Sequence, residues 1–141
     1  MKKVAVVYWS GTGNTEAMAN YVAEGVTAAG GEATLMGPAE FTPDLVSAFD
    51  AIAFGCPAMG SEQLEDMEFE PMFNAVLPAL PGKPIGLFGS YSWADGEWMR
   101  TWQANCEDAG CSLVQDGLAC YDAPDDAAAD ACRALGRALA S

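Results

Sequence analysis

The chain has 141 residues, of which 51% are hydrophobic and 18% are charged, a composition typical of one folded domain and unlike that of a disordered segment. Twenty acidic residues against six basic ones, with no histidine, give a formal net charge of −14, so nucleic acid and anionic membranes are unfavourable partners and a basic protein surface is a favourable one. The five cysteines lack C-x-x-C spacing and histidine neighbours, which argues against zinc and iron–sulfur sites and favours small, reduced, buried residues. We expect a single domain over residues 1–141.

The N-terminus resembles a signal peptide only superficially. Met1-Lys2-Lys3 precedes the apolar run from Val4 to Trp9, but this run is short and no small-residue cleavage site follows it. No apolar stretch approaches the roughly 20 residues of a membrane-spanning helix. These features predict a buried first strand and a cytoplasmic protein.

Strand-like and helix-like segments alternate along the chain. The expected strands are Val4 to Trp9, Ala33 to Met36, Ala51 to Gly55, Ile85 to Gly89 and Leu113 to Cys120. The expected helices are Asn14 to Ala29, Pro71 to Leu80, Gly96 to Ala109 and Asp125 to Ala140, and residues 37–50 form a loop with a short helix. Alternation with continuously apolar strands predicts an α/β fold, in which helices cover both faces of a parallel sheet. Ligands bind such sheets at the carboxyl ends of the strands.

The hexapeptide Ser10-Gly11-Thr12-Gly13-Asn14-Thr15 follows the first strand and opens a helix. Its hydroxyl groups, its flexible glycines and the positive end of the helix dipole suit a phosphate group. The segment contains no Lys or Arg. It therefore predicts a phosphate site built from backbone N–H groups and hydroxyls alone; a generic strand-to-helix turn is the alternative.

Two more loops should converge on the same edge, Cys56 to Met67 after the third strand and Ser90 to Gly96 after the fourth. Met59 and Trp93 could close on the two faces of a flat aromatic ligand. A phosphate site beside a ring slot, with a carboxylate able to accept from a ring N–H, describes a flavin mononucleotide (FMN) pocket. Trp98 and Trp102 follow helical spacing and are expected in the core.

Three motifs resemble those of a known family. Residues 6–19, VVYWSGTGNTEAMA, closely resemble the flavodoxin signature, and Gly55 to Gly60 (GCPAMG) and Gly86 to Tyr91 (GLFGSY) resemble its short-chain, clostridial-type branch. The motifs occur in the family's order, and the resemblance spans essentially the whole chain. It implies a three-layer, doubly wound, five-stranded parallel sheet in the order 2-1-3-4-5. It also implies non-covalent FMN in a low-potential one-electron carrier that shuttles between quinone, semiquinone and anionic hydroquinone states.

The resemblance also implies which residues bind the cofactor. They are Ser10, Gly11, Thr12, Gly13, Asn14, Thr15, Pro57, Ala58, Met59, Gly60, Glu62, Gly89, Ser90, Tyr91, Trp93 and Gly96. Ser10 to Thr15 would hold the phosphate, and the Gly60-Ser61 peptide would act as a redox switch by turning its carbonyl toward flavin N5–H. Glu62 would accept from the pyrimidine N3–H, although it lies in an acidic segment, residues 62–70, that could instead be a solvated surface. No catalytic or metal-ligating residue is implied.

Two departures from the family pattern affect these roles. Ser92 and Ala94 flank Trp93 where relatives usually have glycine, and Ser61 stands where relatives more often have an acidic residue. They leave open the placement of Trp93 and the energetics of the peptide switch.

The resemblance implies a monomeric carrier that replaces ferredoxin between redox enzymes, with basic patches of ferredoxin-linked oxidoreductases and hydrogenase- or reductase-type enzymes as partners. Such a carrier turns over no substrate of its own. An FMN-dependent NAD(P)H quinone reductase-like enzyme and a non-redox anion-binding module are the alternatives. A phosphorylated receiver domain is excluded by Trp9-Ser10 and Gly55-Cys56 at its acidic positions, and a dinucleotide-binding enzyme by the missing third glycine after Gly13.

Overall fold

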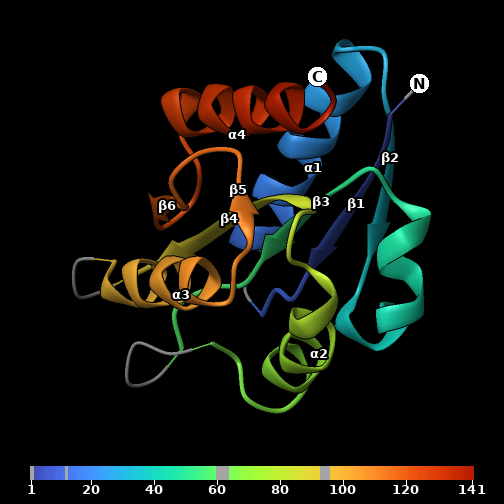
Figure 1. Cartoon of the computed structure of the whole chain (residues 1–141). Coiled ribbons are helices and arrows are strands. Elements are labelled where there is room, and N and C mark those ends of the chain that lie inside the picture. The colour runs from blue at the N-terminus through green and yellow to red at the C-terminus, as the bar shows by residue number, and fades with distance from the viewer. Residues whose placement is uncertain (1, 12, 60–63, 93–95) are drawn as a thin grey trace.

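A parallel β-sheet lies between two layers of helices (Figure 1) in the computed structural model, which describes residues 2–11, 13–59, 64–92 and 96–141. The sheet contains β1 (Lys3–Tyr8), β2 (Glu32–Met36), β3 (Ala51–Gly55), β4 (Pro84–Tyr91), β5 (Ser112–Leu113) and β6 (Leu118–Tyr121). Its order is β2-β1-β3-β4-β5, and β6 also pairs with β4. This confirms the predicted doubly wound α/β sheet, whose strand order changes direction between β1 and β3.

The fifth position of the sheet departs from the sequence prediction. The single strand expected over Leu113 to Cys120 is wrong, because that chain is divided into β5 and β6. Ser112 lies opposite Pro84 and Leu118 opposite Phe88, so the edge chain uses six residue steps where β4 uses four. The Gly117 N–H donates to the side chain of Gln103 at 2.7 Å. Polar residues in this stretch thus bond to a helix and form a bulge.

The helices divide between the two faces of the sheet. The first face carries α1 (Asn14–Ala28) and α4 (Asp126–Leu139), and the second carries α2 (Phe69–Val76) and α3 (Glu97–Asp108). Short 3₁₀ segments, η1 (Pro38–Glu40), η2 (Pro43–Ala48) and η3 (Leu77–Ala79), complete the connections. Within the described residues, no helix combines the length and apolarity that a membrane crossing requires.

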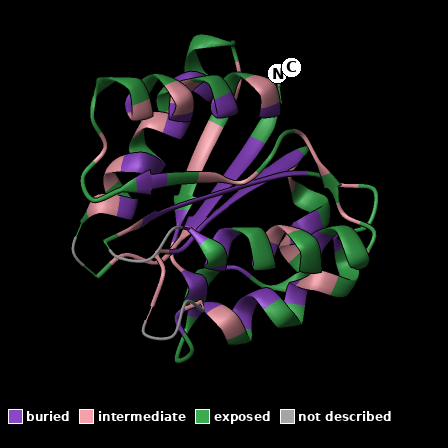
Figure 2. Cartoon of the chain, turned by 90° about the vertical axis from the view of Figure 1, so that its left-hand side faces the viewer, coloured by how far each residue is buried: buried purple, intermediate pink, exposed green. Residues whose placement is uncertain are grey.

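Strand residues alternate between two separate cores. Val4 and Val6 pack with the apolar sides of α1 and α4, whereas Ala5 and Val7 face the layer of α2 and α3. Figure 2 shows these buried sheet residues between helices whose outer sides are exposed. Because helices cover both faces of the sheet, its central strands are continuous apolar runs in the sequence, and this made them easy to predict.

Aromatic residues and cysteines fill the interior as expected. Trp98 and Trp102 are buried, which confirms their predicted core positions. All five cysteines are free thiols, four of them buried and Cys111 half-buried. The interpretation of the cysteines as small interior residues is confirmed.

The start of α2 is held by a buried carboxylate. Glu65 is 4% exposed; its Oε1 accepts from the N–H groups of Glu68 and Phe69, both at 2.8 Å, and its Oε2 from that of Met67 at 2.9 Å. Burial raises the pKa of this carboxyl, but the three N–H groups outweigh burial and leave the pKa below its usual value. The alternative of a uniformly solvated acidic segment is therefore wrong at this position.

We expect Glu65→Gln to lower the free energy of unfolding at pH 7 by about 1–2 kcal/mol, because it removes the charge from three hydrogen bonds. A carboxyl whose pKa is depressed by folding stabilises the protein above its unfolded pKa, and this stabilisation is lost as pH falls through the folded pKa. The difference from wild type should therefore be full above pH 4.5, the usual pKa, and shrink below it. Urea unfolding at several pH values measures it. Asp66→Asn, on the exposed neighbour, should have little effect; a pH-independent loss in Glu65→Gln would contradict the role of the charge.

Candidate functional site

The carboxyl ends of four strands converge on one edge of the sheet. Backbone hydrogen bonds continue the parallel ladder past the strand ends: Trp9 N–H to Gly55 C=O (3.0 Å), Cys56 N–H to Phe88 C=O (3.1 Å), Ala58 N–H to Ser90 C=O (3.0 Å) and Asp122 N–H to Tyr91 C=O (2.7 Å). The segments that follow β1, β3, β4 and β6 are therefore fixed to one another. The predicted meeting of the first, third and fourth strand ends is confirmed.

A cavity of about 220 Å³ opens between these segments. It is lined by Trp9, Gly11, Asn14, Pro57, Ala58, Met59, Ser90, Tyr91, Ser92 and Asp122. Small-molecule pockets usually measure ~300–1,000 Å³, so a cavity of this size encloses part of a nucleotide and leaves the rest open. Its aromatic and thioether side chains suit a flat ring.

The start of α1 supplies donors beside this cavity. Ser10 Oγ accepts from the N–H groups of Gly13 (3.1 Å) and Glu16 (3.2 Å), so its own proton remains free to be donated. Gly13 is in the left-handed region with φ of 98°, which glycine adopts without strain. The amides of Asn14 and Thr15 have no hydrogen-bond partner among the described residues. Unpaired donors at the positive end of a helix form an anion site.

Thr15 lies behind the cavity surface. It is 1% exposed, and its Oγ1 lies 3.2 Å from Ser90 Oγ and accepts from Ser90 N–H at 3.4 Å. The hydroxyl therefore ties the start of α1 to the end of β4. Thr15 can therefore offer an anion only its backbone N–H and the hydroxyl proton that it shares with Ser90.

Two predicted glycines do not line the cavity. A Cβ on Gly89 would lie 2.1 Å from the carbonyl oxygen of Cys56, so this glycine lets β4 approach the chain that directly follows β3. Gly96 begins α3 with φ of 85° and lines a separate depression beside Gly117. Both shape the segments around the cavity without facing it.

Five predicted residues lie outside the described part of the chain: Thr12, Gly60, Ser61, Glu62 and Trp93. The proposed phosphate hydroxyl of Thr12, the peptide switch, the N3–H acceptor and the second ring cover therefore rest on the sequence. Apart from Gly89 and Gly96, the remaining predicted residues line the cavity or lie next to lining residues.

Sequence reasoning missed three residues of the cavity wall: Ser92, which lies in a loop that was expected here, and Trp9 and Asp122, which do not. Trp9 directly precedes the phosphate loop, and its Nε1–H donates to Glu68 at 3.2 Å. Asp122 follows β6 and has φ of 57°, a positive value that no other non-glycine described residue shares. Both follow a parallel strand at its carboxyl end, so the rule that located the other loops would have found them.

Few groups in or beside the cavity carry a charge. Asp122 is the one charged residue of its described lining. At the end of β3, burial raises the pKa of the Cys56 thiol to about 12, with a further contribution from the nearby Glu65 and Glu70. The thiol is therefore neutral at physiological pH and is a poor nucleophile.

The carboxyl edge of this doubly wound sheet combines three features: a helix N-terminus whose amides have no partner among the described residues, a hydroxyl donor and an adjoining slot for a ring. Together they define a mononucleotide-binding domain. The family model for flavodoxin matches residues 6–136. The chain belongs to the flavodoxin family.

Individual relatives agree with this assignment along nearly the whole chain. Flavodoxin of Megasphaera elsdenii is 47% identical, with 97% of this chain and 98% of that protein covered. Flavodoxin of Clostridium beijerinckii is 39% identical, with 96% and 98% covered. The solution structure of two-electron reduced M. elsdenii flavodoxin superposes with a TM-score of 0.88 at 48% identity, covering 97% of this chain and 98% of that one.

The chain is thus an FMN-binding electron carrier and not an enzyme with its own substrate. The amides of Asn14 and Thr15, which no described residue pairs, fit a phosphate-bearing aromatic cofactor together with the Ser10 hydroxyl and the slot beside Met59. The quinone reductase and anion-binding alternatives are not favoured.

Proposed function

We propose that the chain, as a single domain over residues 1–141, is a low-potential one-electron carrier that holds FMN non-covalently. One observation carries this proposal: the lining of the cavity beside the anion site is mainly apolar and aromatic, and its one charged described residue is Asp122, a carboxylate. When bound, FMN supplies electron transfer one electron at a time and gains negative charge on full reduction. The described lining offers no cation to stabilise that charge.

Each described residue has a distinct role in this proposal. Ser10 donates its hydroxyl proton to the phosphate, and the amides of Asn14 and Thr15 donate beside it. Met59 and Tyr91 contact the ring from the segments after β3 and within β4. The two segments are joined by a backbone hydrogen bond of 3.0 Å, which the Ala58 N–H donates to the Ser90 carbonyl. This bond fixes the slot before the ligand arrives.

The residues outside the described part complete the proposed site. Thr12 would add a phosphate hydroxyl, Trp93 would cover the second ring face, and Glu62 would accept the N3–H. The Gly60-Ser61 peptide would respond to reduction by turning. Among the described residues of the cavity wall, Pro57 has no backbone N–H to donate to the cofactor, so it contributes only to the shape of the wall.

Asp122→Asn should raise the potential of the step that charges the cofactor. At a separation of about 10 Å and an effective dielectric constant near 20, a carboxylate opposes a new negative charge by ~1.7 kcal/mol, which corresponds to ~70 mV for one electron. Screening by salt makes this an upper value. Asparagine also accepts the left-handed backbone of position 122, so the fold should persist. Potentiometric titration of the FMN-loaded protein measures the shift; Asp44→Asn on the exposed start of η2 is the control. An unchanged or lower potential in Asp122→Asn would contradict the electrostatic account.

We further propose that the protein is a cytoplasmic monomer that substitutes for ferredoxin. Its net charge of −14 favours basic surfaces of ferredoxin-linked oxidoreductases and of hydrogenase- or reductase-type enzymes. Reductive titration tests the carrier: we expect two separate one-electron steps, the second below the potential of free FMN in the same buffer. Reduction in a single two-electron step would contradict one-electron transfer.

A further inference from the structure

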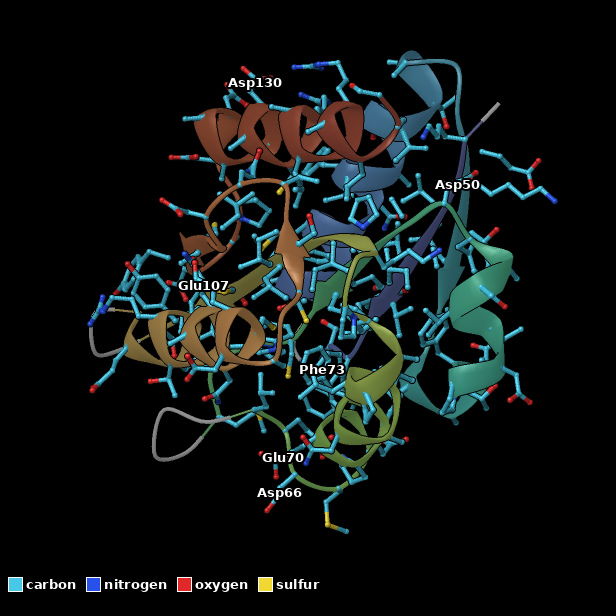
Figure 3. The ribbon with its side chains drawn as sticks, viewed as in Figure 1. Asp50, Asp66, Glu70, Phe73, Glu107 and Asp130 are labelled. Atoms are coloured by element: carbon cyan, nitrogen blue, oxygen red, sulfur yellow. The ribbon has the colours of Figure 1, made fainter. Side chains whose placement is uncertain are left out.

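The turn that ends α3 brings two of the cysteines together. Gly110 has φ of 85°, the left-handed conformation that commonly follows a helix. Its N–H donates to the Glu107 carbonyl at 3.0 Å, and the Cys111 N–H donates to the Cys106 carbonyl at 3.0 Å. These two bonds form a Schellman motif, in which the residue after the left-handed glycine commonly packs against the residue five positions earlier. Figure 3 labels Glu107, which belongs to this turn, on α3.

The turn holds the two cysteines at a separation that a disulfide can span. A backbone hydrogen bond of 3.0 Å keeps the Cα atoms of Cys106 and Cys111 within about 7 Å of each other, because the bond lengths on either side of it are fixed. Disulfides join residues whose Cα atoms lie ~4.4–6.8 Å apart. Cys106 belongs to the core beneath α2 and α3, and Cys111 packs against the same core. Both side chains therefore lie on the inner side of the turn.

The two thiols differ in reactivity. Cys106 is buried and Cys111 is half-buried. Burial raises the pKa of the Cys106 thiol to about 12, and the charge and hydrogen bonding of Cys111 contribute further to this rise. Burial also raises the pKa of Cys111, but its hydrogen-bond interaction with Cys106 opposes that rise. Because the thiolate is the nucleophile in disulfide exchange, the more accessible and more readily ionised Cys111 is the thiol that reacts first.

The pair lies away from the cofactor cavity. Cys111 directly precedes β5, and Ser112 of β5 lies opposite Pro84 at the amino end of β4. The cavity instead adjoins Ser90 and Tyr91 at the carboxyl end of the same strand. The six residue steps from Pro84 to Ser90 span ~20 Å along a strand. Chemistry at the two thiols is therefore separate from chemistry at the cavity.

We propose that Cys106 and Cys111 form a second redox centre, a dithiol that low-molecular-weight disulfides such as oxidised glutathione convert reversibly to a disulfide. The Cys111 thiolate attacks the disulfide of glutathione and releases one reduced glutathione. The Cys106 thiol then loses its proton and attacks Sγ of Cys111, so that the protein disulfide forms and the second reduced glutathione leaves. The protein thiols give up two electrons and two protons, which reduce the glutathione disulfide. This inference goes beyond the electron-carrier function and does not depend on it.

Mass spectrometry of the FMN-loaded protein after incubation with oxidised glutathione tests the pair. We expect the wild type to lose two hydrogen atoms, to retain no glutathione and to fall from five alkylatable thiols to three. Cleavage at Glu107 or Asp108 by a protease specific for acidic residues separates Cys106 from Cys111, so a disulfide should hold the two resulting peptides together. An excess of reduced glutathione should restore all five thiols.

Single variants test the order of the two steps. Cys106→Ala should accumulate glutathione on Cys111, because the thiol that would release it is missing. Cys111→Ala should react at least about 10-fold more slowly, because the remaining Cys106 is buried and protonated. Cys120 and Cys132 are the matched control: they are buried neighbours on the other face of the sheet, and both should keep their thiols in the wild type.

The flavin spectrum, recorded in parallel, should be unchanged in every sample, which shows that each variant is folded and loaded. A wild-type protein that keeps all five thiols would overturn the proposal. So would a Cys111 that retains glutathione in the wild type, or peptides that separate after cleavage of the turn, because either result would show that Cys106 cannot reach its partner.

Discussion

Replacing Gly25 or Gly136 by alanine is expected to lower the free energy of unfolding by about 3 kcal/mol, the upper end of the usual range for overpacked interiors. A Cβ on Gly25 would lie 2.0 Å from the carbonyl oxygen of Arg133, and one on Gly136 would lie 2.0 Å from that of Val22. Both obstacles are backbone atoms of the facing helix, so no side chain can rotate to make room. The α1 and α4 helices would have to separate, which would loosen the core beneath them.

The sign of this effect opposes helix propensity. Alanine is more favourable than glycine within an isolated helix by ~1 kcal/mol, so a gain in stability would show that the close approach of α1 and α4 is wrong. Gly37→Ala is the control, because its Cβ would meet only Glu40 Oε1 at an ordinary 3.5 Å. The double variant should lose less than the two single losses combined, since one separation of the helices relieves both contacts. Urea unfolding followed by circular dichroism measures the four variants and the wild type.

Ser10→Ala should weaken FMN binding by about 10- to 100-fold, the effect of losing a hydrogen bond to a charged group. The variant loses the hydroxyl proton offered to the phosphate and also the acceptor of the Gly13 and Glu16 amides. Riboflavin, which lacks the phosphate, separates the two consequences: its affinity should change much less. Fluorescence quenching of either flavin by apoprotein gives the dissociation constants.

Ser112→Ala, on the exposed β5 at the far end of the sheet, is the matched control and should bind both flavins as wild type does. Equal losses for FMN and riboflavin in Ser10→Ala would contradict a specific role in holding phosphate. They would indicate that Ser10 only shapes the start of α1.

The layered fold could be predicted because its strands are buried on both faces and form continuous apolar runs. The division of the last strand could not, since the bulge depends on Gln103 of α3, a partner far along the chain. Nothing in the local sequence at Gly25 or Gly136 distinguishes a helix contact from an unfavourable helical glycine. Such contacts exist only once the tertiary structure brings two segments together.

Some residues in and around the site could also be predicted from the sequence, and others could not. Ser10, Asn14 and Met59 could be located because glycines and strand ends mark their loops. The burial of Glu65 could not, because its acidic neighbours read as a solvated surface, and the carboxylate is buried by the turn that it itself stabilises. Asp122 could have been located by the same rule, because it follows β6 at the carboxyl edge of the sheet; only its left-handed backbone, with φ of 57°, could not be predicted from the sequence Tyr-Asp-Ala.

The most direct test of the central claim is titration of the apoprotein with FMN, followed by absorbance and by mass identification of the released cofactor. The account predicts a yellow protein with one FMN per chain and a lower affinity for riboflavin, because the amides of Asn14 and Thr15 and the hydroxyl of Ser10 are arranged for a phosphate. A folded but colourless protein that cannot be reconstituted with FMN would contradict it.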